Sequence, residues 1–127
     1  VGYDCSDNLE AEGCLRSLDQ ALQQLPLGHQ AIHHSDRGSQ YCCHVYVERL
    51  TSAGLSISMT EENHCYENAQ AERLNGVLKQ EYLLGETFKC KSDSYEAIHQ
   101  GIYLYNTHRP HQALNYQIPA RVHRMAA

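Results

Sequence analysis

The stretch His33-His34-Ser35-Asp36-Arg37-Gly38-Ser39-Gln40-Tyr41 decides the fold, together with a second stretch, Asn68-Ala69-Gln70-Ala71-Glu72-Arg73-Leu74-Asn75. Asp36 follows a short extended run, and Glu72 lies inside a helical pattern, with 35 residues between the two carboxylates. One helix, one strand and a loop fit into that interval and can bring the chain back to its starting point. That geometry can place both carboxylates on one divalent metal site, since Mg²⁺ and Mn²⁺ prefer oxygen ligands. Spacing alone is weak evidence, because two acidic residues this far apart occur by chance in most proteins.

Around these stretches, hydrophobic periodicity predicts alternating helices and short strands. In chain order we expect the tail of a strand at 1–3, helix 7–25, strand 29–35, helix 39–52, strand 55–59, a polar mobile loop at 60–67, a helix from 68, a helix from about 92 to 109, and an irregular tail through 119. Asp7 with Glu10 matches a capping box, and Gly54 suits a left-handed helix stop.

The same periodicity predicts which side chains face the core. The expected inward positions are Ala11, Leu15, Leu18, Leu22 and Leu25 in the first helix, Val45, Val47 and Leu50 in the second, Ala71, Leu74, Leu78 and Tyr82 in the third, and Tyr95, Ile98, Ile102 and Tyr105 in the last. Glu72, Asn75 and Lys79 fall on a separate, outward stripe at i, i+3 and i+7.

Length and composition favour one small globular domain in the cytoplasm. The chain has 127 residues, 42% hydrophobic and 20% charged, and no apolar run long enough to span a membrane. Its six cysteines form no C-x-x-C pair, so we expect reduced thiols. The nine histidines lack a second cluster at ligand spacing, which disfavours zinc.

Charge is distributed unevenly along the chain. The net charge is −5; residues 1–66 carry three basic and nine acidic residues, whereas 67–127 carry seven and six. A protein of this charge does not bind nucleic acid through its overall field. Any phosphate-facing surface is therefore expected mainly in the second half.

The motifs HSDRGSQY, SMT, ENAQAERLNGVLKQE and YNTHRPHQAL, in this order, resemble the catalytic core of DDE-type insertion-sequence transposases, relatives of the retroviral integrases. The resemblance extends from residue 1 to about 122, which gives a partial integrase catalytic core at 1–122 and a C-terminal tail at 123–127. It implies an α/β, ribonuclease H-like fold with strand order 3-2-1-4-5, of which strands three, four and five are expected here. The first two strands, with a further aspartate on the first, would precede Val1.

The resemblance implies a role for each matching residue. Asp36 and Glu72 would be catalytic ligands of Mg²⁺ or Mn²⁺, and the positions expected to contact DNA are Asn75, Lys79, Arg109 and His111. Asp4, Asp7 and Asp19 do not match the missing aspartate. The chain departs from the family pattern at Glu62-Asn63, where relatives have Asn-Gly, and at Glu67-Asn68-Ala69, where they have Asp-Asn-Ala.

Each residue also has a simpler interpretation. Asp36 before Arg37-Gly38 can cap a turn, and Glu72 and Lys79 can be solvated helix charges. Arg109 and His111 can complement a helix dipole. Gln40 and Tyr41 are expected to pack or to orient the loop, and His33 and His34 to be strand residues.

The implied function is part of a transposase that cuts and joins DNA strands by metal-dependent phosphoryl transfer. Expected partners are DNA, namely transposon ends and target, and further copies of the chain; membranes and small-molecule substrates are not expected. The protein would be cytoplasmic and associated with the nucleoid when bound to DNA. Alternatives are an inactive remnant that binds DNA or self-associates, and a generic metal nuclease; this chain alone is expected to be inactive.

Overall fold

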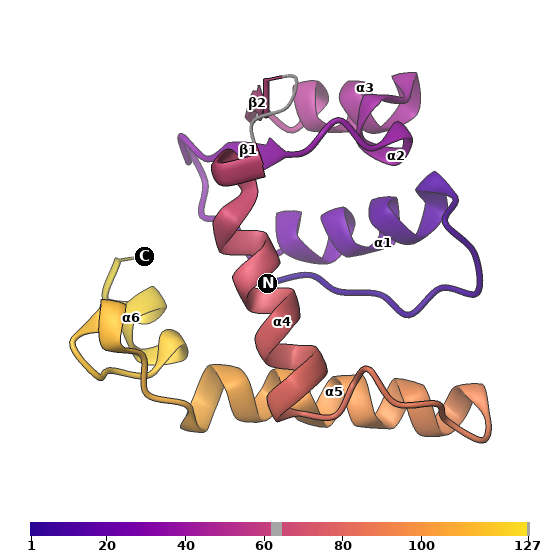
Figure 1. Ribbon diagram of the computed structural model, residues 1–127. Coiled ribbons are helices and arrows are strands. Elements are labelled where there is room, and N and C mark those ends of the chain that lie inside the picture. Colours follow the sequence, from indigo (N-terminus) through magenta and orange to yellow (C-terminus); the bar gives the residue numbers. More distant parts are fainter. Residues whose placement is uncertain (62–64, 127) are drawn as a thin grey trace. The chain divides into compact units, whose positions relative to one another are not determined.

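The computed structural model describes residues 1–61 and 65–126 (Figure 1). The chain divides into two compact units, Val1–Ala71 and Glu72–Ala127, and each is considered by itself. Both helices and a small parallel sheet are present, as the α/β expectation requires. No helix among the described residues is both long enough and apolar enough to cross a membrane.

The first unit contains a two-stranded parallel sheet. Strand β1 (Ile32–Ser35) pairs with β2 (Ser56–Met59), so that Ile32 lies opposite Ser56 and Ser35 opposite Met59. The Thr60 amide donates to the Ser35 carbonyl oxygen at 3.0 Å, which extends the pairing by one residue. Both predicted strands are confirmed, although each is shorter than expected, and their carboxyl ends meet at one edge.

Three helices of this unit build its core: α1 (Ala11–Leu22), α2 (Ser39–Cys42) and α3 (His44–Ser52), with α1 alongside the other two (Figure 1). The single helix expected at 39–52 is wrong, because Cys43 is extended (φ −69°, ψ 147°) and separates α2 from α3. The restart places Tyr46 and Leu50 on the inward face, where they meet Leu18. Val45, an expected core residue, is 58% exposed.

Left-handed backbone at Gly54 (φ +75°) ends the turn after α3, as predicted. Helix α1, by contrast, ends at Leu22 rather than at 25, so Leu25 is not part of its apolar face. Within α1, Leu18 is buried and Leu15 and Leu22 pack partly against the core, which confirms the predicted stripe.

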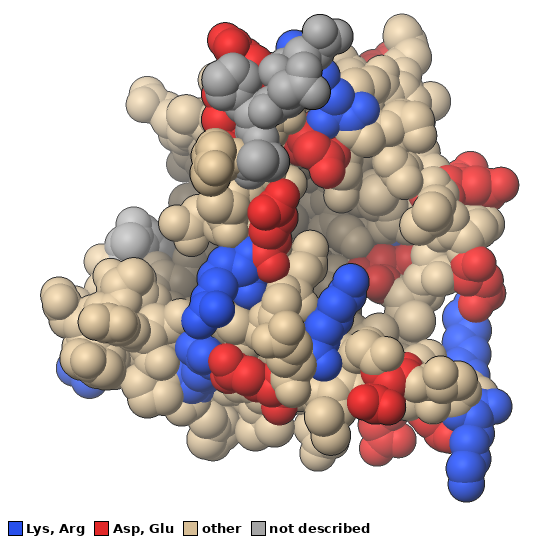
Figure 2. Space-filling view, in the orientation of Figure 1, with Lys and Arg blue, Asp and Glu red and all other residues tan. Residues whose placement is uncertain are grey.

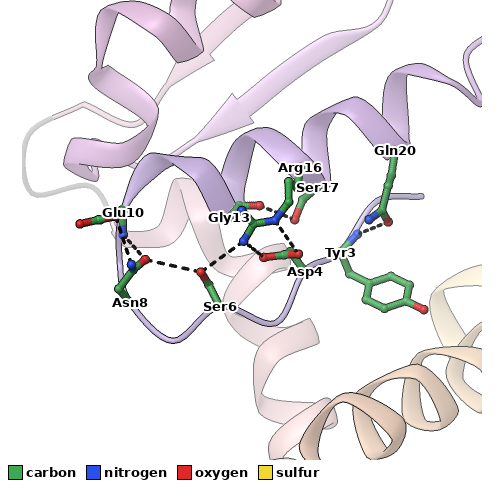
Figure 3. A network of polar contacts seen from close by, with 9 residues as sticks. All are labelled: Tyr3, Asp4, Ser6, Asn8, Glu10, Gly13, Arg16, Ser17 and Gln20. Atoms are coloured by element: carbon green, nitrogen blue, oxygen red, sulfur yellow. Dashed lines mark hydrogen bonds and ion pairs between the residues drawn. The ribbon is translucent and has the colours of Figure 1, made fainter. Parts of the chain in front are cut away.

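The N-terminal segment is not a strand; it lies along α1 (Figure 3). A Cβ on Gly2 would stand 1.7 Å from the Ser17 carbonyl oxygen, so only glycine permits this approach. The Tyr3 amide donates to Gln20 Oε1 at 3.3 Å. Close approach of the backbone to α1 therefore replaces the sheet pairing expected for 1–3.

The predicted capping box at the start of α1 is also wrong. The N-cap residue is Glu10, which makes no side-chain capping bond. Instead, Asn8 Oδ1 accepts from the Glu10 amide at 3.2 Å and Asn8 Nδ2 donates to Glu10 Oε2 at 3.1 Å (Figure 3). A local turn thus takes the place of the expected Asp7 cap.

Polar residues between β2 and the next helix are only partly described. Thr60 is buried, and η1 (Cys65–Asn68) is a 3₁₀ turn, so this part of the expected irregular loop is ordered into a helical turn. The Glu61 amide donates to Glu67 Oε2 at 2.9 Å. The departure from the family pattern at Glu62-Asn63 lies outside the described residues.

Helix α4 (Ala69–Glu81) enters the second unit at Glu72, followed by α5 (Lys91–His108), η2 (Gln112–Leu114) and α6 (Pro119–Ala126). Val77 is the buried hydrophobic residue of α4, whereas Ala71 and Leu74, expected inward, are exposed. Gly101 of α5 is buried because the Tyr82 side chain covers it, 3.3 Å from where its Cβ would be.

Two expectations for the last part of the chain need correction. Tyr95 is 52% exposed, so the predicted inward face of α5 does not begin there. The segment after Pro110 is not irregular: His111 bridges Gln117 in antiparallel fashion, and α6 packs against α5. The division at 122/123 stays a prediction.

Candidate functional site

Asp36 lies directly after β1, at the edge where both strands end, and its side chain is exposed. Its Oδ1 atom accepts the Gly38 amide at 2.9 Å, which closes a turn. Oδ2 accepts no hydrogen bond from the described residues. The turn interpretation is therefore confirmed, and it leaves one carboxylate oxygen available to an outside ligand.

Gly38 makes room for this arrangement. A Cβ at this position would stand 3.0 Å from Asp36 Oδ1 and 2.9 Å from Gln40 Oε1. Both oxygens therefore border the space above the Gly38 Cα atom. Only glycine at this position lets Asp36 Oδ1 and Gln40 Oε1 stay where they are.

Arg37 connects the ends of the two strands. Its Nε donates to the Thr60 carbonyl oxygen at 2.7 Å, and Thr60 directly follows β2. Thr60 therefore makes two backbone hydrogen bonds at this edge: its carbonyl oxygen accepts from Arg37, and its amide donates to the Ser35 carbonyl oxygen. The turn that carries Asp36 is thus fastened to the neighbouring strand.

Glu72, Asn75 and Lys79 lie on α4 with exposed side chains, as the sequence predicts. Spacings of three and four residues put them on one stripe of the helix. None of the three side chains is hydrogen-bonded or ion-paired to another described residue. A carboxylate, an amide and an ammonium group are therefore presented together from one rigid element.

Asp36 and Glu72 belong to different units, so their common metal site stays a prediction. Among residues 1–61 and 65–126, no group of three or more His, Cys, Asp and Glu side chains is placed to hold a metal ion. Asp4 and Asp19, which do not match the aspartate expected on the first strand, form ion pairs elsewhere: Asp4 Oδ2 pairs with Arg16 Nη2 and Asp19 Oδ1 with Arg49 Nε, each at 2.7 Å (Figure 3 shows the former).

Arg109, one of the expected DNA contacts, has a carboxylate partner that sequence reasoning missed. Its Nε and Nη2 atoms donate to the two oxygens of Glu81 at 2.9 and 2.7 Å. This bond raises the pKa of Arg109 and lowers that of Glu81. The signal available in the sequence was an acidic residue at the end of one helix and a basic residue at the end of the next.

His111, the other expected contact near this helix end, is packed against Tyr105 with ring centroids 4.8 Å apart. Its Nε2 atom and Gln117 Oε1 are buried without a hydrogen-bond partner among the described residues. Burial, followed by the charge of Arg109, lowers the pKa of His111. The structure thus gives His111 a packed position and leaves its DNA role a prediction.

His33 and His34 are strand residues, as expected. His33 Nε2 lies 3.1 Å from the Tyr46 hydroxyl, and its ring contacts those of Tyr41 and Tyr46. Burial lowers the pKa of His33 and raises that of Tyr46 to about 12. Tyr41 therefore packs in the core, which confirms its expected structural role.

Among the described residues drawn in Figure 2, Lys and Arg side chains alternate with Asp and Glu side chains. This distribution fits the net charge of −5. Any contact with DNA phosphates on this face would depend on individual cations at defined places.

Residues 53–119, more than half of the chain, match the family described as the Integrase core domain. The chain belongs to this family, which implies a ribonuclease H-like fold and confirms the resemblance seen in its motifs. Glu72, Asn75, Lys79, Arg109 and His111 lie inside the matched segment, and Asp36 lies before it.

The relatives are proteins of insertion sequences. The chain is 37% identical, over its whole length, to 48% of the insertion element IS600 uncharacterized 31 kDa protein of Shigella sonnei. It is 35% identical to the transposase for insertion sequence element IS629 of Shigella sonnei, covering 94% of this chain and 40% of that protein. The putative transposase InsK for IS150 of Escherichia coli K12 is 30% identical over 86% of this chain and 38% of its own. The chain spans half or less of their lengths.

Proposed function

We propose that this chain carries part of the catalytic core of a transposase, which cuts and joins DNA strands at transposon ends and target. Family membership and the transposase names of two relatives support this proposal. The observation that carries it is the placement of the exposed Asp36 at the carboxyl end of β1, with Oδ1 held in a turn and Oδ2 without a hydrogen bond from the described residues. A ligand-binding carboxylate at this edge is typical of sheets whose strands are parallel.

The metal of this proposal is Mg²⁺ or Mn²⁺, held by Asp36 and Glu72. The donor set fits, because both groups are exposed carboxylates and Mg²⁺ and Mn²⁺ prefer carboxylate oxygens as ligands. Divalent ions in such sites stabilise the attacking and leaving oxygens of an in-line phosphoryl transfer. The chain spans 48% and 40% of two relatives, and we propose that the third carboxylate, which the resemblance implies, is not among these 127 residues.

The chain's own residues would position this chemistry. The Asx-type turn orients Asp36, and α4 presents Glu72 with Asn75 and Lys79 on the same stripe. Lys79 lies almost two turns beyond Glu72, where its ammonium group can bind a phosphate of the DNA strand and Asn75 can hydrogen-bond near it. Arg109, held in place by its ion pair with Glu81, would contact DNA at the end of α5. His111 would contact DNA from the turn that its bridge with Gln117 closes.

In the cell, we place the protein in the cytoplasm, where it would associate with the nucleoid through DNA and assemble into a complex of several copies.

A second candidate function, a non-catalytic module that binds DNA or self-associates, is favoured by the sheet. Parallel sheets are normally covered on both faces, yet Ile32 is 68% and Ile57 38% exposed, and these residues point to opposite faces.

Calorimetry with Mn²⁺ tests the metal proposal. The wild-type chain should bind weakly, and Asp36→Asn or Glu72→Gln should each abolish binding. Glu96→Gln, which removes an exposed carboxylate of α5 without a predicted role, is the control and should bind as wild type. Equal Mn²⁺ binding by all four proteins would exclude the shared site.

A strand-transfer assay separates the two candidate functions. Without the third carboxylate, the 127 residues alone are expected not to join DNA, because each lost 1.36 kcal/mol of transition-state stabilisation costs about tenfold in rate. A chain extended upstream to include the expected aspartate strand should join DNA in Mg²⁺, and Glu72→Gln should abolish this. A longer protein that binds DNA but transfers no strand would favour the non-catalytic module.

A further inference from the structure

The first unit, Val1–Ala71, contains three Lys or Arg side chains, all arginine, and two of them form an ion pair with an aspartate. Arg16 is paired with Asp4 and Arg49 with Asp19, each at 2.7 Å. Arg37 makes its hydrogen bond to the Thr60 carbonyl, which carries no formal charge, and has no ion pair with the described residues. Within residues 1–61 and 65–71, its positive charge is therefore not compensated by a bonded carboxylate.

Arg37 lies at the place where DNA would meet the proposed metal site. It follows Asp36 directly, at the carboxyl edge of β1 and β2, and its side chain is exposed. The 2.7 Å hydrogen bond from Nε to the Thr60 carbonyl oxygen fixes the guanidinium group at the nitrogen that joins it to the rest of the side chain. Fixing one nitrogen of a planar group reduces the side-chain entropy that binding a ligand would otherwise cost.

The remaining donors of Arg37 suit an anion. With Nε engaged, the two Nη atoms keep four N–H groups in a fork that matches two oxygens of a phosphate. A side chain that served only to fasten the two strands would need a single donor toward Thr60. The structural role and the anion-binding role therefore use different atoms, and different substitutions can separate them.

We propose that Arg37 binds a phosphate group of DNA beside Asp36, while its Nε bond to Thr60 holds it in position. This inference rests on the proposed action of the protein on DNA and adds a phosphate contact from the otherwise acidic first half of the chain. It adds to the contact proposed for Lys79, which comes from α4.

The substitution Arg37→Gln separates charge from structure. Glutamine has the same number of side-chain atoms up to its Nε2 amide as arginine has up to Nε, so it can still donate to Thr60 but carries no charge. Arg49→Gln is the matched control, since it removes the same charge from the same unit at a residue already paired with Asp19. Arg37→Ala removes both the charge and the bond.

The measurement is binding of a short fluorescein-labelled DNA duplex to the chain by anisotropy, over a series of salt concentrations with Mn²⁺ present. For Arg37→Gln the slope of log K against log salt should be smaller than in wild type by about 0.9, the value for one phosphate contact on duplex DNA. Arg49→Gln should keep the wild-type slope. The midpoint temperature of thermal unfolding should be unchanged in Arg37→Gln and lowered in Arg37→Ala.

A salt slope equal to wild type in Arg37→Gln would overturn the assignment of Arg37. An equal reduction of the slope in Arg37→Gln and Arg49→Gln would do the same, and both results would leave the metal proposal intact. No duplex binding by the wild-type chain at low salt would overturn the proposed action on DNA and this inference with it. Mn²⁺ calorimetry on Glu72→Gln decides the metal site separately.

Discussion

Arg109 and Glu81, 28 residues apart, form a two-pronged ion pair in which Nε and Nη2 of the arginine each donate to a different carboxylate oxygen, at 2.9 and 2.7 Å. Tyr105 lies beneath the guanidinium group, with Cζ 5.9 Å from the ring centroid. The pair joins the last residue of α4 to the residue after α5. The end of the YN-x-x-R-x-H motif therefore has a structural task whether or not it also meets DNA.

The Glu81–Arg109 pair predicts a pH dependence of stability. The hydrogen bond from Arg109 lowers the pKa of Glu81 from its ordinary 4.5. A lowered pKa means that the contribution is complete above pH 4.5 and is lost as the pH falls through the folded-state value. Unfolding midpoints of wild type and Glu81→Gln should therefore differ at neutral pH and converge in acid. A constant difference down to low pH would contradict this.

Lys79→Ala should weaken DNA binding and lower its salt slope by about one phosphate contact, because the exposed ammonium lies on the Glu72 stripe. Lys89→Ala, in the exposed loop before α5, is the control and should leave the slope unchanged. A slope in Lys79→Ala equal to wild type would assign Lys79 to the solvated surface.

Gly38→Ala should reduce Mn²⁺ affinity with little effect on folding. The new Cβ would come within 3.0 Å of Asp36 Oδ1 and 2.9 Å of Gln40 Oε1, and both atoms end flexible side chains that can move aside. Gly76→Ala, in α4 with nothing within 4 Å of its Cβ position, is the control. It should raise stability by about 1 kcal/mol and leave Mn²⁺ binding unchanged. Unaltered affinity in Gly38→Ala, measured by calorimetry, would show that the turn does not position Asp36 for metal.

His33 should titrate below its ordinary pKa of 6.5, because burial disfavours its charged form. Above pH 6.5 both folded and unfolded states hold it neutral; below this value the unfolded chain takes up a proton that the folded chain resists, so stability decreases as the pH falls. His33→Phe should lose this part of the pH dependence. An NMR titration of the His33 ring with a midpoint at or above 6.5 would refute the prediction.

Among the described residues of the first unit, Leu50 is the large side chain that has no exposed surface. Leu50→Ala should therefore cost about 2–5 kcal/mol in the free energy of unfolding, through lost transfer energy and a cavity. Val45→Ala, on the exposed side of α3, should cost less than about 0.5 kcal/mol. Denaturant unfolding of both variants tests whether the core lies on the Tyr46–Leu50 stripe; equal losses would place it elsewhere.

The sequence by itself determined those features that depend on short-range order. Alternation and spacing placed β1, β2, the apolar stripe of α1 and the left-handed Gly54, and put Asp36 at the end of a strand and Glu72, Asn75 and Lys79 on one exposed stripe. Backbone preferences and the 3.6- and 2-residue periods act within a few residues, so a linear pattern records them.

Only the tertiary structure decided which distant groups meet. The break at Cys43 turned Tyr46 inward in place of Val45, and packing on α1 replaced the expected strand at 1–3. Partners such as Glu81 for Arg109 and Thr60 for Arg37 are 28 and 23 residues away. No local pattern encodes these pairs, because each depends on where two separate elements end in space.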